Sequence, residues 1–394
     1  MELKNKIKDL TEKYYSKVIE IRRYIHQNPE LSFCEVQTSA YVESQLKNLG
    51  ITYQKGIAKT GVVALIEGKK PSKRVIALRA DMDALPVEEK TDFSYKSTNK
   101  GIMHACGHDV HTSSLLGVIF ILNELKDSFE GTIKCIFQPG EEKLPGGAKQ
   151  MIDEGVLKNP TPEFILAQHV YPELTTGKAG FKSGIYMAST DELYLTVKGK
   201  GGHGAMPEKI TNTVLTAAKI ITALQEIPKN SENIPTVLTI GKVIANGATN
   251  VIPDEVNMEG TFRTMDENWR AICHGKINKT AQEIASAMGA TAEVNIKKGY
   301  PVLINHDKKT QKAIEYAQMF LGKENVEMLD KRMTSEDFAY FSQQIPATFY
   351  RLGTTKPGTD YYPLHSSYFN VDEESIKTGI GLMAFLSLQI LNEC

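Results

Sequence analysis

Two adjacent carboxylates, Glu141 and Glu142, follow an apolar run at residues 132–137 and turn residues at 138–140. Most glutamate pairs in proteins are solvated surface, but this pair comes directly after a predicted buried strand. Side chains alternate faces along a strand, and at its end the chain turns, so the two neighbours can serve one centre in different roles. We therefore predict that Glu142 binds a metal ion and that Glu141 acts as a base beside it.

A Cys-Gly-His sequence at residues 106–108 supplies candidate partners for the glutamates. A glycine between them lets the backbone turn tightly, so Cys106 and His108 can converge on one centre. Thiolate and imidazole are ligands of zinc and of its neighbours in the transition series. The apolar pattern of residues 109–125 predicts a helix, which places the pair at a helix N-terminus. A structural cysteine and a core histidine are the alternative if this cluster stood alone.

Two further histidines favour the metal site. His169 follows the apolar run 164–167 at the predicted tip of a strand, and His365 lies in a predicted loop before the last helix. Open α/β sheets gather their ligands at such strand ends. Donors distributed from residue 106 to residue 365 indicate a site assembled by folding, unlike the local spacing of a zinc finger. A divalent ion lowers the pKa of a bound water from about 15.7 to about 7, so Glu141 could remove its proton.

Six motifs, in the same order, resemble those of the M20 metallopeptidases. Within that family the similarity is to the amidohydrolase branch of aminoacylase-like, hippurate-hydrolase-like and auxin-conjugate-hydrolase-like enzymes. The resemblance covers nearly the whole chain. The motifs are RRYIHQNPEL (22–31), LRADMDALP (78–86), MHACGHD (103–109), QPGEE (138–142), GHGAMP (202–207) and SEDF (335–338).

The resemblance implies two divalent metal ions per subunit, with Glu141 as general base. Zinc is the first expectation for this mixed donor set, and manganese, cobalt and nickel stay open. Other branches have a metal-binding histidine where this chain has Asp81, so Asp81 is a less certain ligand. Asp83 is interpreted as a carboxylate that orients a ligand or the base, with a plain loop carboxylate as the alternative. The implied ligands are Cys106, His108, Glu142, His169 and His365.

The resemblance also assigns residues that handle the substrate. His203 is similar to the family's histidine that contacts the carbonyl oxygen as negative charge develops on it. Asn250 and Arg263 are similar to the residues that bind the substrate carboxylate, a role that suits the planar donor fork of arginine. Without the resemblance, a turn histidine and a surface arginine are the simpler interpretations.

Together these residues predict a metal-dependent amidohydrolase that cleaves N-acyl amino acids (N-acetyl, N-benzoyl or similar) to a carboxylate and a free amino acid. A dipeptidase or carboxypeptidase using the same dinuclear site is one alternative. A non-catalytic metal-binding regulatory protein is another. A cysteine hydrolase with Cys106 as nucleophile is disfavoured, because His108 is too close in sequence to be its base and the glutamate pair would have no role.

The order of predicted elements divides the chain into two domains. Alternating helix and strand patterns in residues 1–180 and 297–394 favour an α/β catalytic domain, with a helix-covered, mostly parallel sheet that binds the metals. Residues 181–296 follow the order strand, helix, strand, strand, helix, strand of an inserted ferredoxin-like α+β domain. In the family such a domain acts as a lid and pairs subunits, which implies a homo-oligomer formed through it.

Composition limits the partners and the location. The chain has 394 residues, 41% of them hydrophobic, enough for two cores, and its formal net charge of -1 gives no reason to expect nucleic acid. No apolar run approaches the ~20 residues that span a membrane, and the N-terminus lacks the apolar core of a secretory signal. Five widely spread cysteines fit a reducing compartment. We therefore expect a cytoplasmic protein with a small-molecule substrate and no membrane partner.

Overall fold

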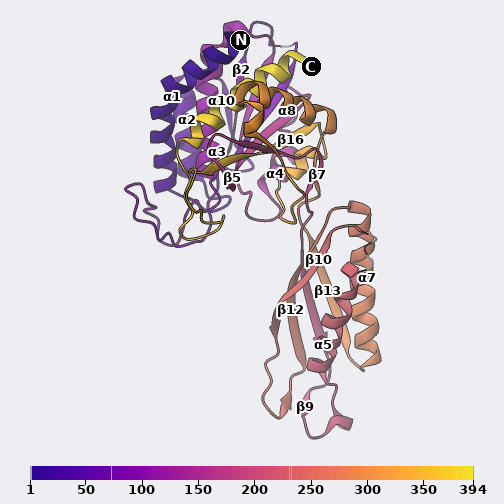
Figure 1. Cartoon of the computed structure of the whole chain (residues 1–394). Helices are drawn as coiled ribbons and strands as arrows, with labels where there is room; N and C mark the ends of the chain where they lie inside the picture. Colours follow the sequence, from indigo (N-terminus) through magenta and orange to yellow (C-terminus); the bar gives the residue numbers. More distant parts are fainter. Residues whose placement is uncertain (1, 72, 230, 232, 394) are drawn as a thin grey trace. The chain divides into compact units, whose positions relative to one another are not determined.

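The computed structural model describes residues 2–71, 73–229, 231 and 233–393, and these form two compact units (Figure 1). Unit 1 consists of Met1–Tyr186, Ile304–Asp330 and Asp337–Cys394, and unit 2 consists of Met187–Leu303 and Lys331–Glu336. The sequence predicts boundaries at 180/181 and 296/297. In the structure the chain changes unit at 186/187 and 303/304, and the short segment at 331–336 joins unit 2.

Unit 1 is built on one eight-stranded sheet. The pairs β4–β3, β3–β5, β5–β16 and β6–β15 are parallel, and β1–β2, β2–β4 and β16–β6 are antiparallel. The predicted mostly parallel α/β sheet is thus confirmed. In spatial order the strands are β1 (Tyr53–Ile57), β2 (Gly61–Glu67), β4 (Thr132–Gln138), β3 (Val75–Asp81), β5 (Ile165–Thr175), β16 (Ala347–Thr355), β6 (Ala179–Phe181) and β15 (Val326–Met328).

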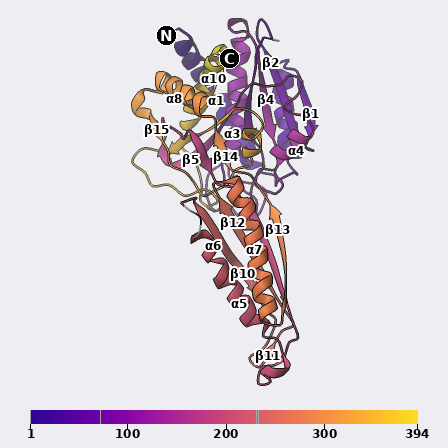
Figure 2. The ribbon, with the colours of Figure 1, turned by 90° about the vertical axis from the view of Figure 1, so that its right-hand side faces the viewer.

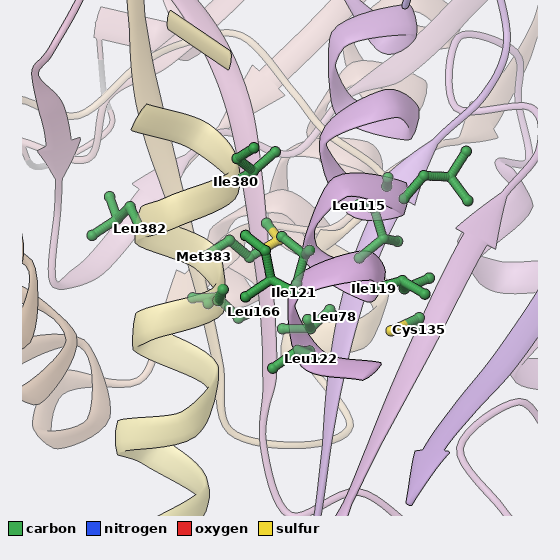
Figure 3. Close-up of a cluster of buried hydrophobic side chains, with 14 of the residues drawn as sticks. Leu78, Leu115, Ile119, Ile121, Leu122, Cys135, Leu166, Ile380, Leu382 and Met383 are labelled. Atoms are coloured by element: carbon green, nitrogen blue, oxygen red, sulfur yellow. The ribbon is translucent and has the colours of Figure 1, made fainter. Parts of the chain in front are cut away.

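Helices cover this sheet, and the helix α3 (His108–Glu124) packs between it and two other helices. Every residue of α3 from His108 to Leu122 is buried. The first two turns carry buried polar side chains, and residues 115–122 are apolar on all sides, as expected for a helix inside a core. Figure 3 shows Leu115 and Leu122 of α3 in one buried cluster with Leu78 and Met383 from neighbouring elements. Burial of each such leucine side chain stabilises the folded state by about 1.5–3 kcal/mol relative to leaving it exposed to water. The other helices are α1 (Glu2–Gln27), α2 (Val36–Asn48), α4 (Gly147–Asp153), α8 (Asp307–Leu321), α9 (Ala339–Ser342) and α10 (Ser375–Glu393).

The parallel strands place chemically active residues at one edge of the sheet. β3 ends at Asp81 opposite Gln138, the last residue of β4, so the segments that follow both strands start side by side. His169 differs from its prediction, because β5 continues to Thr175 and His169 lies within the strand. The pairing of β3 with β5 ends at the Arg79–Ala167 pair, whereas β16 continues beside His169.

Unit 2 has its own sheet of four antiparallel strands, in the order β10 (Thr236–Ile244), β12 (Glu255–Thr264), β8 (Asp191–Lys198), β13 (Thr291–Lys298). The helices α5 (Thr213–Leu224) and α7 (Glu267–Ala287) lie together on one face of this sheet (Figure 2). The chain order β8, α5, β10, β12, α7, β13 is that of a ferredoxin-like domain, as predicted.

Short elements complete both units. β9 (Gly202–His203) pairs with β11 (Val251–Ile252), and β7 (Gly184–Met187) pairs with β14 (Leu303–Asn305). A four-residue helix, α6, covers Glu226–Lys229, and 3-10 turns lie at Lys126–Ser128, Pro207–Lys209 and Lys323–Asn325. No helix in the described part of the chain combines the length and the apolar character needed to cross a membrane.

Candidate active site

Five side chains predicted as metal ligands form one cluster in unit 1. Their donor atoms fall into overlapping groups of three, and within each group the atoms lie within 4.8 Å of one another. Cys106 Sγ is 3.5 Å from His169 Nε2, and Glu142 Oε1 is 3.4 Å from His365 Nε2 and 3.9 Å from His108 Nε2. The groups that contain these ligands are Cys106/His108/His169, Cys106/Glu142/His365, His108/Glu141/Glu142 and Asp81/His108/His111, so Glu141, Asp81 and His111 border the cluster.

Local backbone conformation brings the cluster together. Gly107 precedes α3 with a φ of +79°, and a Cβ at this position would lie 2.5 Å from Val170 Cγ2 of β5. Only glycine therefore permits this close contact between the loop and the strand that carries His169. His365 also has a left-handed φ, of 67°, and its N–H donates to the carbonyl oxygen of Ala105 at 2.8 Å. That bond ties the loop of His365 to the segment of Cys106.

Hydrogen bonds orient the ligand rings. His108 Nδ1 lies 2.9 Å from the Asp83 carbonyl oxygen, and His169 Nδ1 lies 2.7 Å from the Val170 carbonyl oxygen, so each Nδ1 carries the proton that it donates. Both rings then direct an Nε2 lone pair toward the cluster. Among the described residues, His108 Nε2 and Glu142 Oε1 are buried without a hydrogen-bond partner. Buried polar atoms rarely stay unpaired, and a divalent cation satisfies such a pair of acceptors, so this donor set fits metal ions.

The thiol of Cys106 suits the same interpretation. Burial, with the nearby charge of Glu142, raises the pKa of Cys106 above its ordinary value in the metal-free chain. A coordinated cation reverses this effect, since it stabilises the thiolate directly. The raised pKa disfavours Cys106 as a free thiolate nucleophile, whereas a bound cation would stabilise its thiolate.

Asp81 and His111 belong to a neighbouring network. Asp81 Oδ1 accepts from His111 Nδ1 at 2.6 Å, and Asp81 Oδ2 accepts from Arg79 Nη1 at 2.6 Å. Burial opposes ionisation of Asp81, but Arg79 and the adjacent histidines hold its pKa well below the usual range. The other ring nitrogen of His111, Nε2, accepts from the Val170 N–H at 2.9 Å, so His111 has no free donor atom for a metal. Asp81, 3.7 Å from His108 Nε2, therefore borders the cluster as a charge paired with Arg79.

The carboxylate of Glu141 is held from a distant part of the chain. Glu141 is only 6% exposed, and the Asp337 N–H donates to its Oε1 at 3.3 Å. The Asp337 carboxylate in turn accepts from Arg79 Nη2, from Gln138 Nε2 and from the Ala148 N–H at 2.8–2.9 Å. Asp337 and Arg79 were not identified as site residues from the sequence. Their signals were present, because both lie inside the resembling motifs and Arg79 is a charge within an apolar strand.

Asp83 connects two of the ligands. Its buried carboxylate accepts from Ser32 Oγ at 2.6 Å, from His108 Nδ1 at 3.2 Å and from the Glu142 N–H at 3.0 Å. We expect Asp83→Asn to weaken metal affinity about 10- to 100-fold, since the amide cannot accept from all three donors. Competition with a chromophoric chelator measures this affinity. Asp92→Asn, at an exposed position, is the control, and equal affinities in both variants would contradict a role for Asp83.

The predicted substrate residues all lie in unit 2. His203 of β9 pairs with Val251 of β11, and the Gly204 N–H donates to the Asn250 carbonyl oxygen at 2.8 Å, so His203 and Asn250 are neighbours. His203 is exposed, and its Nδ1 accepts from the Ala205 N–H, which leaves the ring proton on Nε2 as a donor.

Arg263 lies on β12 of the same unit. Its Nη1 donates to the Met333 carbonyl oxygen and to Ser335 Oγ, each at 3.2 Å. Burial lowers the pKa of Arg263, and no carboxylate pairs with it among the described residues. A half-buried guanidinium without a counter-ion is a candidate anion-binding group.

Comparison with known proteins supports a metal-dependent hydrolase. Residues 77–389 match the sequence profile of peptidase family M20/M25/M40. The chain belongs to this family. The thermostable carboxypeptidase 2 of Saccharolobus solfataricus is 38% identical over 100% of both chains. The N-acyl-L-amino acid amidohydrolase of Geobacillus stearothermophilus is 39% identical over 77% of this chain and 82% of that one.

A solved family member has the same fold. It is a dinuclear metal binding peptidase of the M20 family from Bacillus subtilis, 33% identical, with a TM-score of 0.83 over 97% of this chain and 100% of that chain. These matches confirm the family predicted from the six motifs. M20 membership and the amidohydrolase relatives identify the protein as a hydrolase of amide bonds.

Proposed function

We propose that the protein hydrolyses the amide bond of N-acyl amino acids to a carboxylate and a free amino acid, using two divalent metal ions. The main support is the cluster beside Glu141 in which the buried atoms His108 Nε2 and Glu142 Oε1 face each other, neither with a hydrogen-bond partner in the described part of the chain. Zinc suits the mixed donors best, and manganese, cobalt and nickel are the other candidates. The proposed ligands are Cys106, His108, Glu142, His169 and His365.

Bound divalent cations would supply a water of lowered pKa and polarise the carbonyl group. Glu141 accepts the proton of the attacking water as its oxygen bonds to the acyl carbon. When the C–N bond breaks, Glu141 passes that proton to the leaving nitrogen, so the products are a carboxylate and an amine. The N–H on Nε2 of His203 donates to the oxygen that becomes negative during attack. Asp83 acts by orienting His108.

Asn250 and Arg263 bind the carboxylate of the amino-acid part in this proposal. We expect Arg263→Met to lower kcat/KM for an N-acetyl amino acid about 10- to 100-fold, mainly through KM, because a charge-assisted hydrogen bond contributes about 1.5–3 kcal/mol. The matched control is the same substrate with its carboxylate converted to a primary amide. For this amide, Arg263→Met should lower kcat/KM only slightly. Equal losses on the acid and the amide would contradict this assignment.

A dipeptidase or carboxypeptidase is the alternative, because one relative that matches over its full length is a carboxypeptidase. Release of free amino acid from N-acetyl, N-benzoyl and dipeptide substrates, all with the same C-terminal residue, separates the two. Higher kcat/KM for the acylated substrates supports the proposal, whereas a requirement for a free α-amino group supports the peptidase. No turnover of any substrate by the metal-loaded protein would favour a non-catalytic, metal-binding regulatory protein.

We also propose that unit 2 acts as a lid and dimerisation domain and that the protein is a cytoplasmic homo-oligomer with no nucleic-acid or membrane partner. Exposed apolar side chains on unit 2, at Val214, Leu215 and Val251, support the association. Cys34, Cys106, Cys135 and Cys273 are free thiols, which fits a reducing compartment. Light scattering of the purified chain gives its mass in solution, and a strictly monomeric mass would refute the association.

A further inference from the structure

We propose that Glu35 is a positioning residue that fixes the direction of Glu141 through Gly140, while Asp83 holds Glu142. The inference rests on the proposed function, because it takes Glu141 as the base. Glu35 precedes α2, far from the metal cluster in sequence, and no motif or prediction singled it out. Its side chain is nevertheless completely buried, at 0% exposure.

The carboxylate of Glu35 is occupied by neutral donors. Oε1 accepts from the Gly140 N–H at 2.8 Å and from the Phe33 N–H at 2.9 Å, and Oε2 accepts from Thr60 Oγ1 at 2.7 Å. No cation pairs with it among the described residues. Burial and the charge of Asp83 raise the pKa of Glu35 to about 7. A buried carboxylate without a counter-ion costs folding free energy, so its position calls for another explanation.

The turn itself supplies that explanation. Gly140 has a φ of +60°, and a Cβ there would lie 2.5 Å from the ring of Phe33. The turn is thus in direct contact with the segment that leads into Glu35. The Gly140 N–H donates to Glu35, and the Glu142 N–H donates to Asp83. The backbone amides on both sides of Glu141 are therefore each held by a buried carboxylate.

The four-residue segment 32–35, which ends at Glu35, also holds the carboxylate of Asp83. Ser32 Oγ donates to Asp83 Oδ2 at 2.6 Å, and that oxygen also accepts from the Glu142 N–H. Residues 32–35 thus contact the turn directly through Glu35 and Phe33, and indirectly through Asp83. This arrangement restricts the direction in which Glu141 leaves the backbone. A displacement of about 1 Å in such a group can cost about 100-fold in rate.

Two substitutions at one position test the role of Glu35. Glu35→Ala removes the acceptor of the Gly140 N–H and should lower kcat about 10- to 100-fold, with KM and the number of bound metal ions unchanged. Glu35→Gln keeps an oxygen that can accept from Gly140 and should retain most of the activity. In the Glu141→Gln background, Glu35→Ala should add almost no further loss, because the group it positions is already gone.

Other results would overturn the inference. They are an unchanged kcat in Glu35→Ala, an equal loss in Glu35→Gln, or a full additional loss in the Glu141→Gln background. If Glu35→Ala does not fold, the test uses Glu35→Gln and Thr60→Val. Thr60→Val removes the hydrogen bond from Thr60 Oγ1 to Glu35 and keeps the one from the Gly140 N–H. Crystal structures of Glu35→Ala and of the unsubstituted protein show whether the turn at residues 140–142 moves, and they need no activity assay. A turn that does not move refutes the positioning role even if the proposed substrate is wrong.

Discussion

Glu141→Gln is expected to lower kcat for an N-acyl amino acid by about 100- to 10,000-fold, the range that general acid–base catalysis contributes. Glutamine keeps the size of the side chain and an oxygen that can accept from the Asp337 N–H, but it cannot take a proton from water. The side chain is buried beside the cluster, so bulk water cannot easily replace it. Steady-state kinetics with equal metal loading measure the loss.

Two controls make this result specific. The exposed Glu88→Gln should leave kcat unchanged, and metal analysis should find the same number of ions in Glu141→Gln as in the unsubstituted protein. Glu142→Gln should instead lose metal, since Glu142 is the proposed ligand. Near-normal turnover by Glu141→Gln would show that another group is the base. Loss of metal from Glu141→Gln would make Glu141 a ligand and exchange the roles of the two glutamates.

Removal of the metal ions should have the other large effect. Dialysis against a chelator is expected to reduce activity to the background rate, and added zinc, manganese, cobalt or nickel should restore it to different extents. The metal-free chain should also unfold at a lower temperature. A ligand at 100 times its dissociation constant stabilises the folded state by about 2.7 kcal/mol. The measurements are metal content, initial rate and thermal midpoint on the same samples.

The control for this experiment is a chelator already saturated with metal, which should change neither activity nor stability. Activity that persists in a chain shown to hold less than a tenth of an equivalent of metal would contradict metal-dependent hydrolysis. Such activity would bring back Cys106 as a nucleophile, despite the raised pKa that burial gives its thiol.

The fold could be predicted largely from local patterns. Apolar runs of strand length alternating with helical periodicity gave the parallel core of unit 1, and the helix predicted at 109–125 is α3, at His108–Glu124. The position of His169 within its strand was harder to predict from the sequence. An apolar run shows where a strand begins to be buried, but β5 continues past His169 because β16 pairs with it there. Such an extension depends on a strand that is distant in sequence.

The candidate site divides in the same way. The ligands Cys106 and His108 lie within one short motif, and Glu141 and Glu142 lie within another, so their residue types and spacing were visible in the sequence. The groups that hold them were not. Glu35 contacts Gly140 across 105 residues, and Arg79 contacts Asp337 across 258. Arg79 stands out as a charge within an apolar strand, but no local feature shows which distant residue each of these buried groups contacts.

The most direct test of the central claim is product analysis in ¹⁸O-labelled water, with the metal-loaded protein and an N-acetyl or N-benzoyl amino acid. Attack of water on the acyl carbon predicts equal amounts of carboxylic acid and free amino acid. One labelled oxygen should appear in the carboxylic acid and none in the amino acid. Intact substrate after prolonged incubation, across both acyl groups and several amino acids, would contradict the claim. So would an amino acid released without the labelled carboxylic acid.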